Sequence, residues 1–289
     1  MLFRTREGLV SGRDAFSRTF TVEEAGTAAD LLARLTGLPK ARVKDCMTKG
    51  GVWLSRPGRK TSRLRRATTA VGPGERLEID YDPELLAITP AQPELIAKTR
   101  HYSVWYKPAG VLSQGTRFAD HCTLPRLAQA LLGARTEPHP VHRLDREARG
   151  IMLLAHDGRA AAKLGELFRL GKVEKEYEAI VRGVPDWTDL EVDRALDGKE
   201  CRSRFHVVRR DQASGTSLLT ASIDTGRKHQ IRRHLAGLGH PVMGDPRYGG
   251  GTARERELQL VAASLAFTCP FTNKQVQWSV PGLTFPLPG

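Results

Sequence analysis

The segment HRLDRE, residues 142–147, constrains this chain more than any other feature. It places Asp145 between Arg143 and Arg146, immediately before an almost uninterrupted apolar run at residues 151–155. A short run that is apolar at successive positions is typical of a strand buried on both faces. Charges beside such a strand must be paired or used, because an unpaired charge in an apolar environment is costly. We therefore expect a functional site here, with Asp145 as its catalytic group.

The chain is strongly basic. Its 289 residues include 45 Lys and Arg against 32 Asp and Glu, which gives a formal net charge of +13 and a pI of about 10.0. This charge favours a polyanionic partner, and nucleic acid before a membrane, because no basic stretch carries bulky apolar anchors. The alternative is a basic surface without a binding role. With 40% hydrophobic residues, the chain is long enough for one large domain or two smaller ones.

The cysteines and the hydropathy pattern predict a cytoplasmic protein. Neither a CxxC pair nor a His at ligand spacing accompanies the four cysteines, so no metal site and no disulfide framework is expected. No apolar run approaches the length of a membrane span, and the first 18 residues carry charges where a signal peptide needs an apolar stretch. The cysteines are Cys46, Cys122, Cys201 and Cys269.

Basic residues cluster between positions 40 and 66, where Asp45 is the single acid. Two helical patterns precede and overlap this cluster: one contains Leu31 and Leu35, and the other contains Val43 and Met47. A glycine pair at 50–51 ends the second, and strands follow at 52–54 and 77–81. The basic residues are Lys40, Arg42, Lys44, Lys49, Arg56, Arg59, Lys60, Arg63, Arg65 and Arg66.

This order of elements resembles the small RNA-binding domain named after ribosomal protein S4, whose paired helices offer basic side chains to phosphates. The resemblance implies that Arg42, Lys44 and Lys49 contact RNA. The alternative is a solvated helical face. We expect an S4-like domain at residues 1–86, a proline-bearing linker at 87–99 and a catalytic domain at 100–289.

The second half mixes helices and strands without regular alternation, which indicates an α+β domain. The patterns predict strands at 104–106, 151–155, 177–181 and 219–223. They predict helices at 124–132 and 158–170, and a further helix on which Ile231, Leu235 and Leu238 share one face.

Four motifs in this half resemble the RluA-type pseudouridine synthases. They are KPAGV at 107–111, HRLDREARG at 142–150, KEYEA at 175–179, and TGRKHQIR at 225–232, which continues into GHP at 239–241 and GDP at 244–246. One departure is the pair Ala148-Arg149, where the family usually has Thr-Ser. The resemblance implies an α+β catalytic domain with a central, mainly antiparallel sheet, flanking helices and a cleft. It also implies isomerisation of uridine to pseudouridine in RNA.

This isomerisation moves the sugar from nitrogen 1 to carbon 5 of uracil, so nothing is added or lost and no cofactor is expected. It requires a carboxylate at the glycosidic bond in a pocket that excludes water. The resemblance implies Asp145 for this role, paired with Arg232, because a guanidinium keeps its charge and grips a carboxylate. It also implies that the Tyr177 ring stacks on the base. Without the family, Arg232 would be a helix surface residue and Tyr177 a sheet residue.

The target nucleotide must leave the RNA stack to reach the carboxylate, so contacts beside the pocket are expected. The resemblance assigns Arg143 to this task and gives His142 a structural role. Lys107 and Arg149 are further candidates for phosphate contacts.

Large-subunit ribosomal RNA is the favoured target, transfer RNA is the alternative, and a monomer is the default. A non-catalytic RNA-binding or ribosome-assembly factor and a hydrolase that uses Asp145 with His142 stay open. The hydrolase lacks a second well-placed carboxylate.

Overall fold

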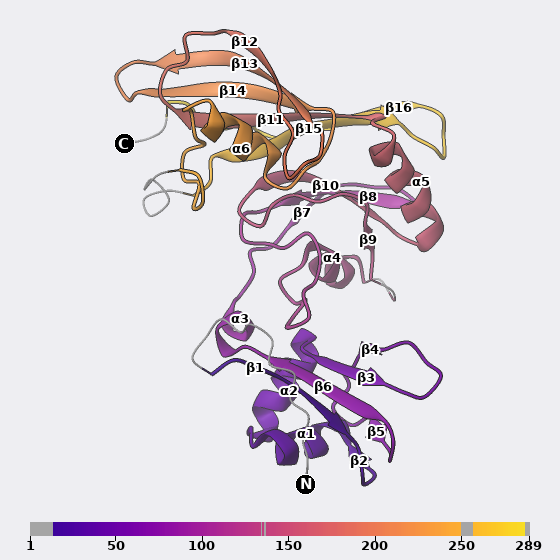
Figure 1. Ribbon diagram of the computed structural model, residues 1–289. Coiled ribbons are helices and arrows are strands. Elements are labelled where there is room, and N and C mark those ends of the chain that lie inside the picture. The colour runs from indigo at the N-terminus through magenta and orange to yellow at the C-terminus, as the bar shows by residue number, and fades with distance from the viewer. Residues whose placement is uncertain (1–13, 134, 136, 250–256, 287–289) are drawn as a thin grey trace. The chain divides into compact units, whose positions relative to one another are not determined.

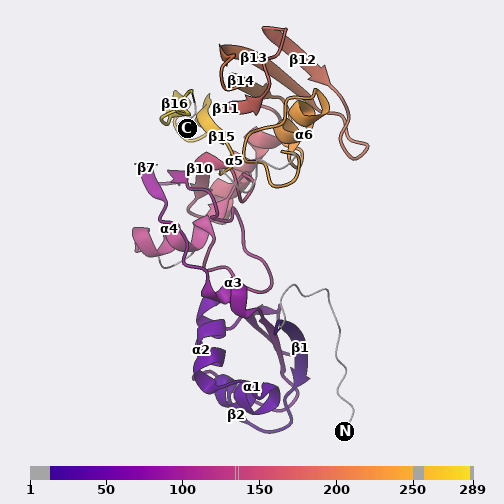
Figure 2. The ribbon, with the colours of Figure 1, turned by 90° about the vertical axis from the view of Figure 1, so that its left-hand side faces the viewer.

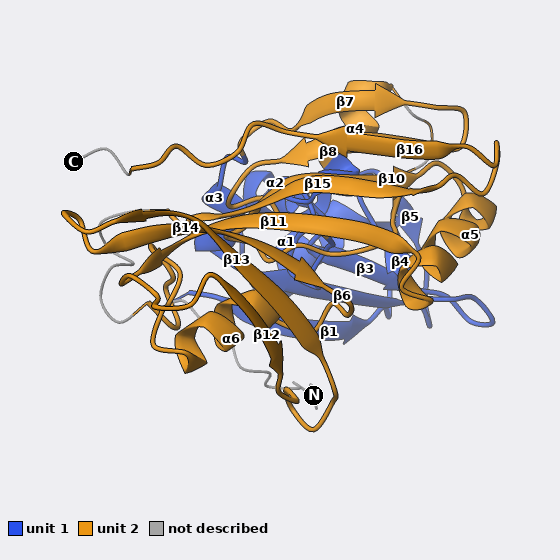
Figure 3. Cartoon of the chain, turned by 90° about the horizontal axis from the view of Figure 1, so that it is seen from above, with its two compact units in different colours: residues 1–90, 114–126 blue, residues 91–113, 127–289 orange. Residues whose placement is uncertain are grey.

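The computed structural model describes residues 14–133, 135, 137–249 and 257–286, which form two compact units (Figure 3). Unit 1 extends to Pro90 and also includes residues 114–126, and unit 2 comprises the remainder. This division differs from the expected one, because part of the second half folds with the first. The predicted linker, 87–99, also contains strand β7 (Glu94–Lys98) of unit 2. Its prolines, Pro90 and Pro93, precede this strand.

Unit 1 packs α1 (Ala28–Thr36) and α2 (Lys40–Lys49) against one face of a four-stranded antiparallel sheet (Figure 2). The Thr27 hydroxyl caps α1 by accepting a hydrogen bond from the backbone N–H of Asp30. The predicted helices and strands of this region are confirmed. In sheet order the strands are β1 (Phe16–Thr21), β6 (Arg76–Tyr81), β3 (Val52–Ser55) and β4 (Ser62–Arg63), and the remaining elements are β2 (Gly26–Thr27), β5 (Ala70–Val71) and α3 (Pro83–Ala87).

The glycine pair that ends α2 also allows the segment 114–126 to pack closely against the rest of unit 1. Gly50 has a φ of 89°, and a Cβ on Gly51 would lie 2.6 Å from the carbonyl oxygens of Asp80 and Phe118. Nearby, Arg63 and Arg65 both contact the carboxylate of Asp120 within the same segment. Part of the basic cluster therefore stabilises unit 1 internally.

Unit 2 is built on a ten-stranded sheet in which every described pairing except β10 with β15 is antiparallel (Figure 1). Helices α5 (Gly158–Arg169) and α6 (Gln230–Gly237) belong to this unit, and α4 (Leu124–Leu132) begins in the segment assigned to unit 1 and ends in unit 2. The predicted α+β class with a mainly antiparallel sheet is confirmed. The order is β12 (Asp189–Asp193), β13 (Arg202–Asp211), β14 (Thr216–Ile223), β11 (Val173–Arg182), β15 (Leu260–Thr268), β10 (Arg149–Ala155), β8 (Tyr102–Lys107) and β7, with β16 (Gln275–Ser279) beside β15 and β9 (His139–Pro140) beside β10.

Strand β10 connects the core to the site. Its residues 150–155 are buried, as predicted, because β8 and β15 lie on its two sides and apolar side chains cover it. Ile151 and Leu153 pack with Leu164 of α5 in one core cluster. The loop that carries Asp145 leads directly into this rigid strand. Among the described residues, no helix has the length and apolar character needed to cross a membrane.

Candidate active site

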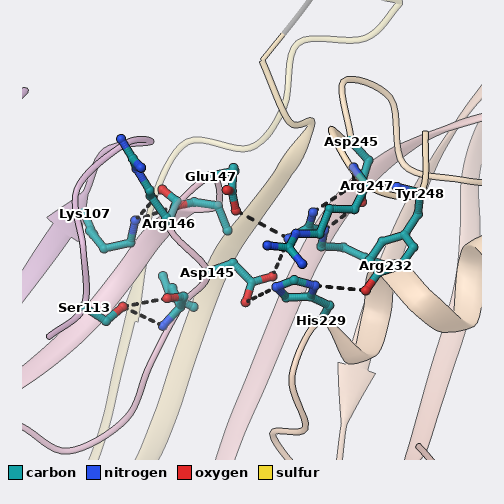
Figure 4. A network of polar contacts seen from close by, with 12 residues as sticks. Lys107, Ser113, Asp145, Arg146, Glu147, His229, Arg232, Asp245, Arg247 and Tyr248 are labelled. Atoms are coloured by element: carbon teal, nitrogen blue, oxygen red, sulfur yellow. Dashed lines mark hydrogen bonds and ion pairs between the residues drawn. The ribbon is translucent and has the colours of Figure 1, made fainter. Parts of the chain in front are cut away.

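The backbone around Asp145 is fixed on both sides (Figure 4). Before it, the buried Ser113 hydroxyl donates to the carbonyl of Leu144 at 2.6 Å and accepts from the N–H of the same residue at 3.0 Å. After it, the ammonium of Lys107 donates to the carbonyls of Arg146 at 3.4 Å and Ala148 at 2.6 Å. Two buried side chains thus hold the backbone on both sides of Asp145 without touching its carboxylate.

Arg232 is the partner of Asp145. Its side chain is 0% exposed, and Nη1 donates to Asp145 Oδ2 at 2.9 Å. Its Nε and Nη2 donate to the two carboxylate oxygens of Asp245 at 2.7 and 2.8 Å, and Glu147 lies 3.5 Å from Nη1. Three carboxylates therefore surround one guanidinium, which leaves it a single productive orientation.

The charges in this cluster are stabilised mutually. Burial alone would lower the pKa of Arg232, but the hydrogen bonds to Asp245 and Asp145 raise it above its ordinary value. Burial would likewise raise the pKa of Asp245, whereas Arg232 and the backbone N–H groups of Arg247 and Tyr248 hold it below its usual range. The guanidinium beside Asp145 is a permanent cation.

A cavity of about 70 Å³ lies beside the carboxylate. One water molecule needs roughly 10–15 Å³, so a larger group can enter. The Asp145 side chain is 23% exposed and lines this space together with Tyr177 and Arg232, as the sequence predicted for a shared site. The full lining is Arg143, Leu144, Asp145, Ala148, Tyr177, Ile223, Gly226, Arg227, His229, Gln230, Ile231, Arg232 and Leu260.

Tyr177 reaches the cavity from β11, where the register with β15 shifts between Glu176 and Tyr177. Such a bulge redirects a side chain locally. Burial, and secondarily the charge of Asp145, raises the pKa of the Tyr177 hydroxyl, so this group stays protonated near neutral pH. The ring is a wall of the cavity and its hydroxyl can donate.

His229, the N-cap of α6, also lines the cavity. Its Nε2 lies 3.8 Å from Asp145 Oδ1, and its Nδ1 shares a 3.1 Å hydrogen bond with the Tyr248 hydroxyl. Figure 4 shows the Asp145 carboxylate facing both this ring and the Arg232 guanidinium. The two carboxylate oxygens thus face different partners.

Of the other predicted site residues, one lines the cavity and two do not. Arg143 is exposed and lines the cavity, as expected of a contact beside the pocket. The prediction that Lys107 contacts phosphate is wrong, because its side chain is buried and its ammonium is occupied by backbone carbonyls, including those of Pro108 and Val111. Arg149 lies outside the cavity lining, at the start of β10, with Glu257 at 3.7 Å.

The basic residues of α2 that were predicted to contact RNA differ in whether their charged groups are free to do so. Arg42 and Lys44 are exposed. Lys49 instead donates to Asp45 at 3.0 Å and to the carbonyl of Leu86 at 2.6 Å, so its charge is partly used within unit 1.

His142 has the structural role that the resemblance implied. Its Nε2 accepts a hydrogen bond from the Leu153 N–H at 3.0 Å, and its ring stacks on Phe168. Burial lowers the pKa of His142 to about 3, which keeps the ring neutral.

Sequence reasoning assigned no role to Ser113, His229, Asp245 or Tyr248. Asp245 and His229 lie in the GDP and TGRKHQIR motifs, so a signal for them existed. Ser113 and Tyr248 stand in no motif that was recognised. Within the described ranges, no group of three or more His, Cys, Asp or Glu side chains is placed to hold a metal ion.

Comparison with known proteins identifies the class of this site. Residues 101–237, which carry Asp145, Tyr177 and Arg232, match the family of RNA pseudouridylate synthases. Human RNA pseudouridylate synthase domain containing 4 has a similar fold, with a TM-score of 0.55 and 27% identity over 66% of this chain and 89% of that chain.

Whole-length relatives extend the match beyond this segment. Ribosomal large subunit pseudouridine synthase C of Yersinia pestis is 30% identical over 91% of each chain, and the Escherichia coli (strain K12) protein of the same name is 30% identical over 90% of this chain and 91% of its own. The tRNA pseudouridine synthase C of Vibrio parahaemolyticus is 28% identical over 65% of this chain and 90% of its own. The chain belongs to the RNA pseudouridine synthase family and is an isomerase that acts on RNA.

Proposed function

We propose that this enzyme converts specific uridines of large-subunit ribosomal RNA to pseudouridine, with Asp145 as its catalytic carboxylate. The observation that carries the proposal is the Asp145–Arg232 pair at 2.9 Å on the wall of a cavity that Tyr177 also lines. The names of the two relatives that match along nearly the whole chain support the ribosomal target.

In this proposal, each cavity residue has a distinct task. Asp145 acts at the glycosidic bond between the sugar and nitrogen 1 of uracil, and the buried Arg232 keeps its carboxylate charged and oriented. The Tyr177 ring stacks on the detached base and holds it while carbon 5 turns toward the sugar. Arg143 braces the RNA from which the nucleotide has been extruded.

Unit 1 in this proposal is the RNA-docking part, an S4-like domain that presents Arg42 and Lys44 to phosphates. Both side chains are exposed on α2, and the first turn of this helix contains no acid. The enzyme in this proposal acts as a monomer in the cytoplasm.

Mapping pseudouridines in total RNA from cells with and without the gene tests this function. One or more large-subunit positions should lose pseudouridine in its absence and regain it when the wild-type chain, but not Asp145→Asn, is restored. An unchanged map would contradict the proposal.

Transfer RNA is the second candidate target, because the Vibrio parahaemolyticus relative is named a tRNA pseudouridine synthase. The same map distinguishes the two, since the vanished position would then lie in a transfer RNA. Release of free uracil or cleavage of the strand by the purified chain would instead indicate a hydrolase.

A further inference from the structure

The proposed reaction requires two proton transfers in addition to the exchange of bonds at the sugar. The bond from carbon 1′ to nitrogen 1 breaks, and a bond from carbon 1′ to carbon 5 forms. Carbon 5 then releases its hydrogen as a proton, and the electron pair of that C–H bond restores the ring double bond. Nitrogen 1, which left the sugar with an electron pair, takes up a proton. A group in the cavity must therefore accept one proton and return one.

Few of the described cavity residues can accept a proton. Arg143, Arg227 and Arg232 are excluded because a guanidinium has donors and no acceptor. The raised pKa of the Tyr177 hydroxyl makes it a donor and not a base. Among the described residues that line the cavity, this leaves Asp145 and His229. Asp145 is engaged at the sugar while the base is being transferred.

The backbone holds His229 in an unusual conformation. Its φ is 54°, in the left-handed region, and Asp197 and Asn273 are the other described non-glycine residues with positive φ. The side chain of His229 makes no capping hydrogen bond to α6, so the conformation does not serve the helix. It places the ring on the cavity wall instead.

Both ring nitrogens have defined surroundings. The Nδ1 shares a hydrogen bond with the Tyr248 hydroxyl at 3.1 Å, and the ring planes of the two residues lie at 74° to each other. The Nε2 lies 3.8 Å from Asp145 Oδ1, the oxygen that Arg232 does not bind. A proton on Nε2 would therefore lie beside a carboxylate, which stabilises the imidazolium that forms on proton transfer.

Burial and the neighbouring cations together favour the neutral form of His229 at rest. Burial lowers its pKa, Asp145 opposes that shift, and the cations of Arg232, Arg247 and Lys228 add to it. The ring is therefore an available base near neutral pH.

Resting on the function proposed above, we propose that His229 is a second catalytic residue, whose Nε2 accepts the carbon 5 proton and returns a proton to nitrogen 1. Asp145 Oδ1 stabilises the transient imidazolium, and Tyr248 fixes the ring. Asp145 and His229 both line the cavity, so one site serves the glycosidic bond and the proton.

A His229→Gln variant tests this inference, because glutamine preserves hydrogen bonding but does not titrate. The probe is large-subunit ribosomal RNA from cells without the gene, prepared with hydrogen, deuterium or tritium at carbon 5 of uridine. Tritium release measures cleavage of the C–H bond. We expect the single-turnover rate of His229→Gln to fall about 100-fold, with the KM for RNA changed by less than about threefold.

Two further readouts separate a base from a positioning residue. Deuterium at carbon 5 should slow His229→Gln more than it slows the wild type, because proton removal becomes rate-limiting. The wild-type rate should fall as the pH drops through the pKa of His229, and His229→Gln should lose that dependence.

His206→Gln is the matched control, because His206 also lies beside a carboxylate, 2.8 Å from Asp189, but is exposed and outside the cavity lining. It should keep the wild-type rate. A wild-type rate in His229→Gln, or a slower rate without the isotope effect and pH change, would overturn the inference alone. No tritium release by the wild type from any cellular RNA would overturn the proposed function as well.

Discussion

The two units use positive charge in opposite ways. In unit 2, Arg232 is fully buried and faces the carboxylates of Asp145, Glu147 and Asp245. In unit 1, the side chains of Arg42 and Lys44 are exposed and, within the described ranges, make no hydrogen bond or ion pair, and only their backbone groups are hydrogen-bonded. A buried cation with several fixed partners is preorganised for chemistry, whereas an exposed cation without partners can exchange water for phosphate. The comparison predicts that substitutions in unit 2 change turnover and substitutions in unit 1 change binding.

The largest effect is expected for Arg232→Lys. Lysine keeps the charge but cannot make the three directed bonds to Asp145 and Asp245, so the carboxylate loses its orientation. We expect kcat to fall about 1,000-fold while the fold is kept, measured as pseudouridine formation alongside circular dichroism.

Arg233→Lys is the matched control on the same helix. Arg233 makes a bidentate pair with Asp197, whose side chain is 71% exposed, and lies outside the cavity lining. Its replacement should change kcat by less than about twofold, because exposed pairs contribute little. An equal loss of kcat in Arg232→Lys and Arg233→Lys would contradict the role given to the buried guanidinium.

A smaller effect is expected at Tyr177. If its ring stacks on the base, Tyr177→Ala should lower kcat/KM about 10- to 100-fold, since stacking on an aromatic side chain contributes roughly 1–3 kcal/mol. Tyr177→Phe should retain more activity than Tyr177→Ala, because the ring persists and only the hydroxyl near Asp145 is lost. If both variants matched the wild type in steady-state assays, Tyr177 would have no role in the site.

On the side of unit 1, the double variant Arg42→Ala, Lys44→Ala should weaken RNA binding about 10-fold at low salt and leave kcat unchanged. Each lost phosphate contact should also reduce the slope of log Kd against log salt by about one. A titration of RNA at several salt concentrations measures both. The control is Arg159→Ala, Lys172→Ala, which removes the same charge from exposed positions of unit 2. An equal loss in that control would mean that only net charge matters.

The last effect is on stability in acid and concerns His142, whose ring packs on Phe168 and is kept neutral by its surroundings. Its folded pKa of about 3 lies below the ordinary value of about 6.5, so the unfolded chain binds more protons between these values. Stability should therefore decrease as the pH falls from about 6.5 toward about 3, by at most about 1.4 kcal/mol per pH unit. His142→Gln should show a shallower loss in urea unfolding across this range, and an unchanged slope would contradict the burial of this ring.

Local sequence patterns predicted the elements whose apolar residues follow a clear pattern along the chain. The apolar run of β10 and the alanine-rich α5 were identified because their periodicity and caps are local properties. Strand β7 was placed in a linker, because an edge strand with exposed residues lacks the apolar pattern of a core strand. The inclusion of residues 114–126 in unit 1 depends on contacts such as Arg65–Asp120, which no local pattern encodes.

The site residues likewise fall into those that sequence motifs predicted and those that only the fold shows. Asp145, Tyr177 and Arg232 could be named from motifs, and the structure brings them to one cavity. Lys107 was predicted to contact phosphate, and only the fold shows that its ammonium donates to four backbone carbonyls. Ser113 was missed because a hydroxyl that holds the backbone of Leu144 leaves no signature of its own.

The central claim is that the Asp145 carboxylate performs the chemistry. Its most direct test is single-turnover formation of pseudouridine by Asp145→Asn on large-subunit ribosomal RNA, with RNA affinity measured on the same sample. We predict no pseudouridine above background while the Kd stays within about threefold of the wild type, because the amide preserves shape but not charge. Pseudouridine formed at a rate near that of the wild type would contradict the account.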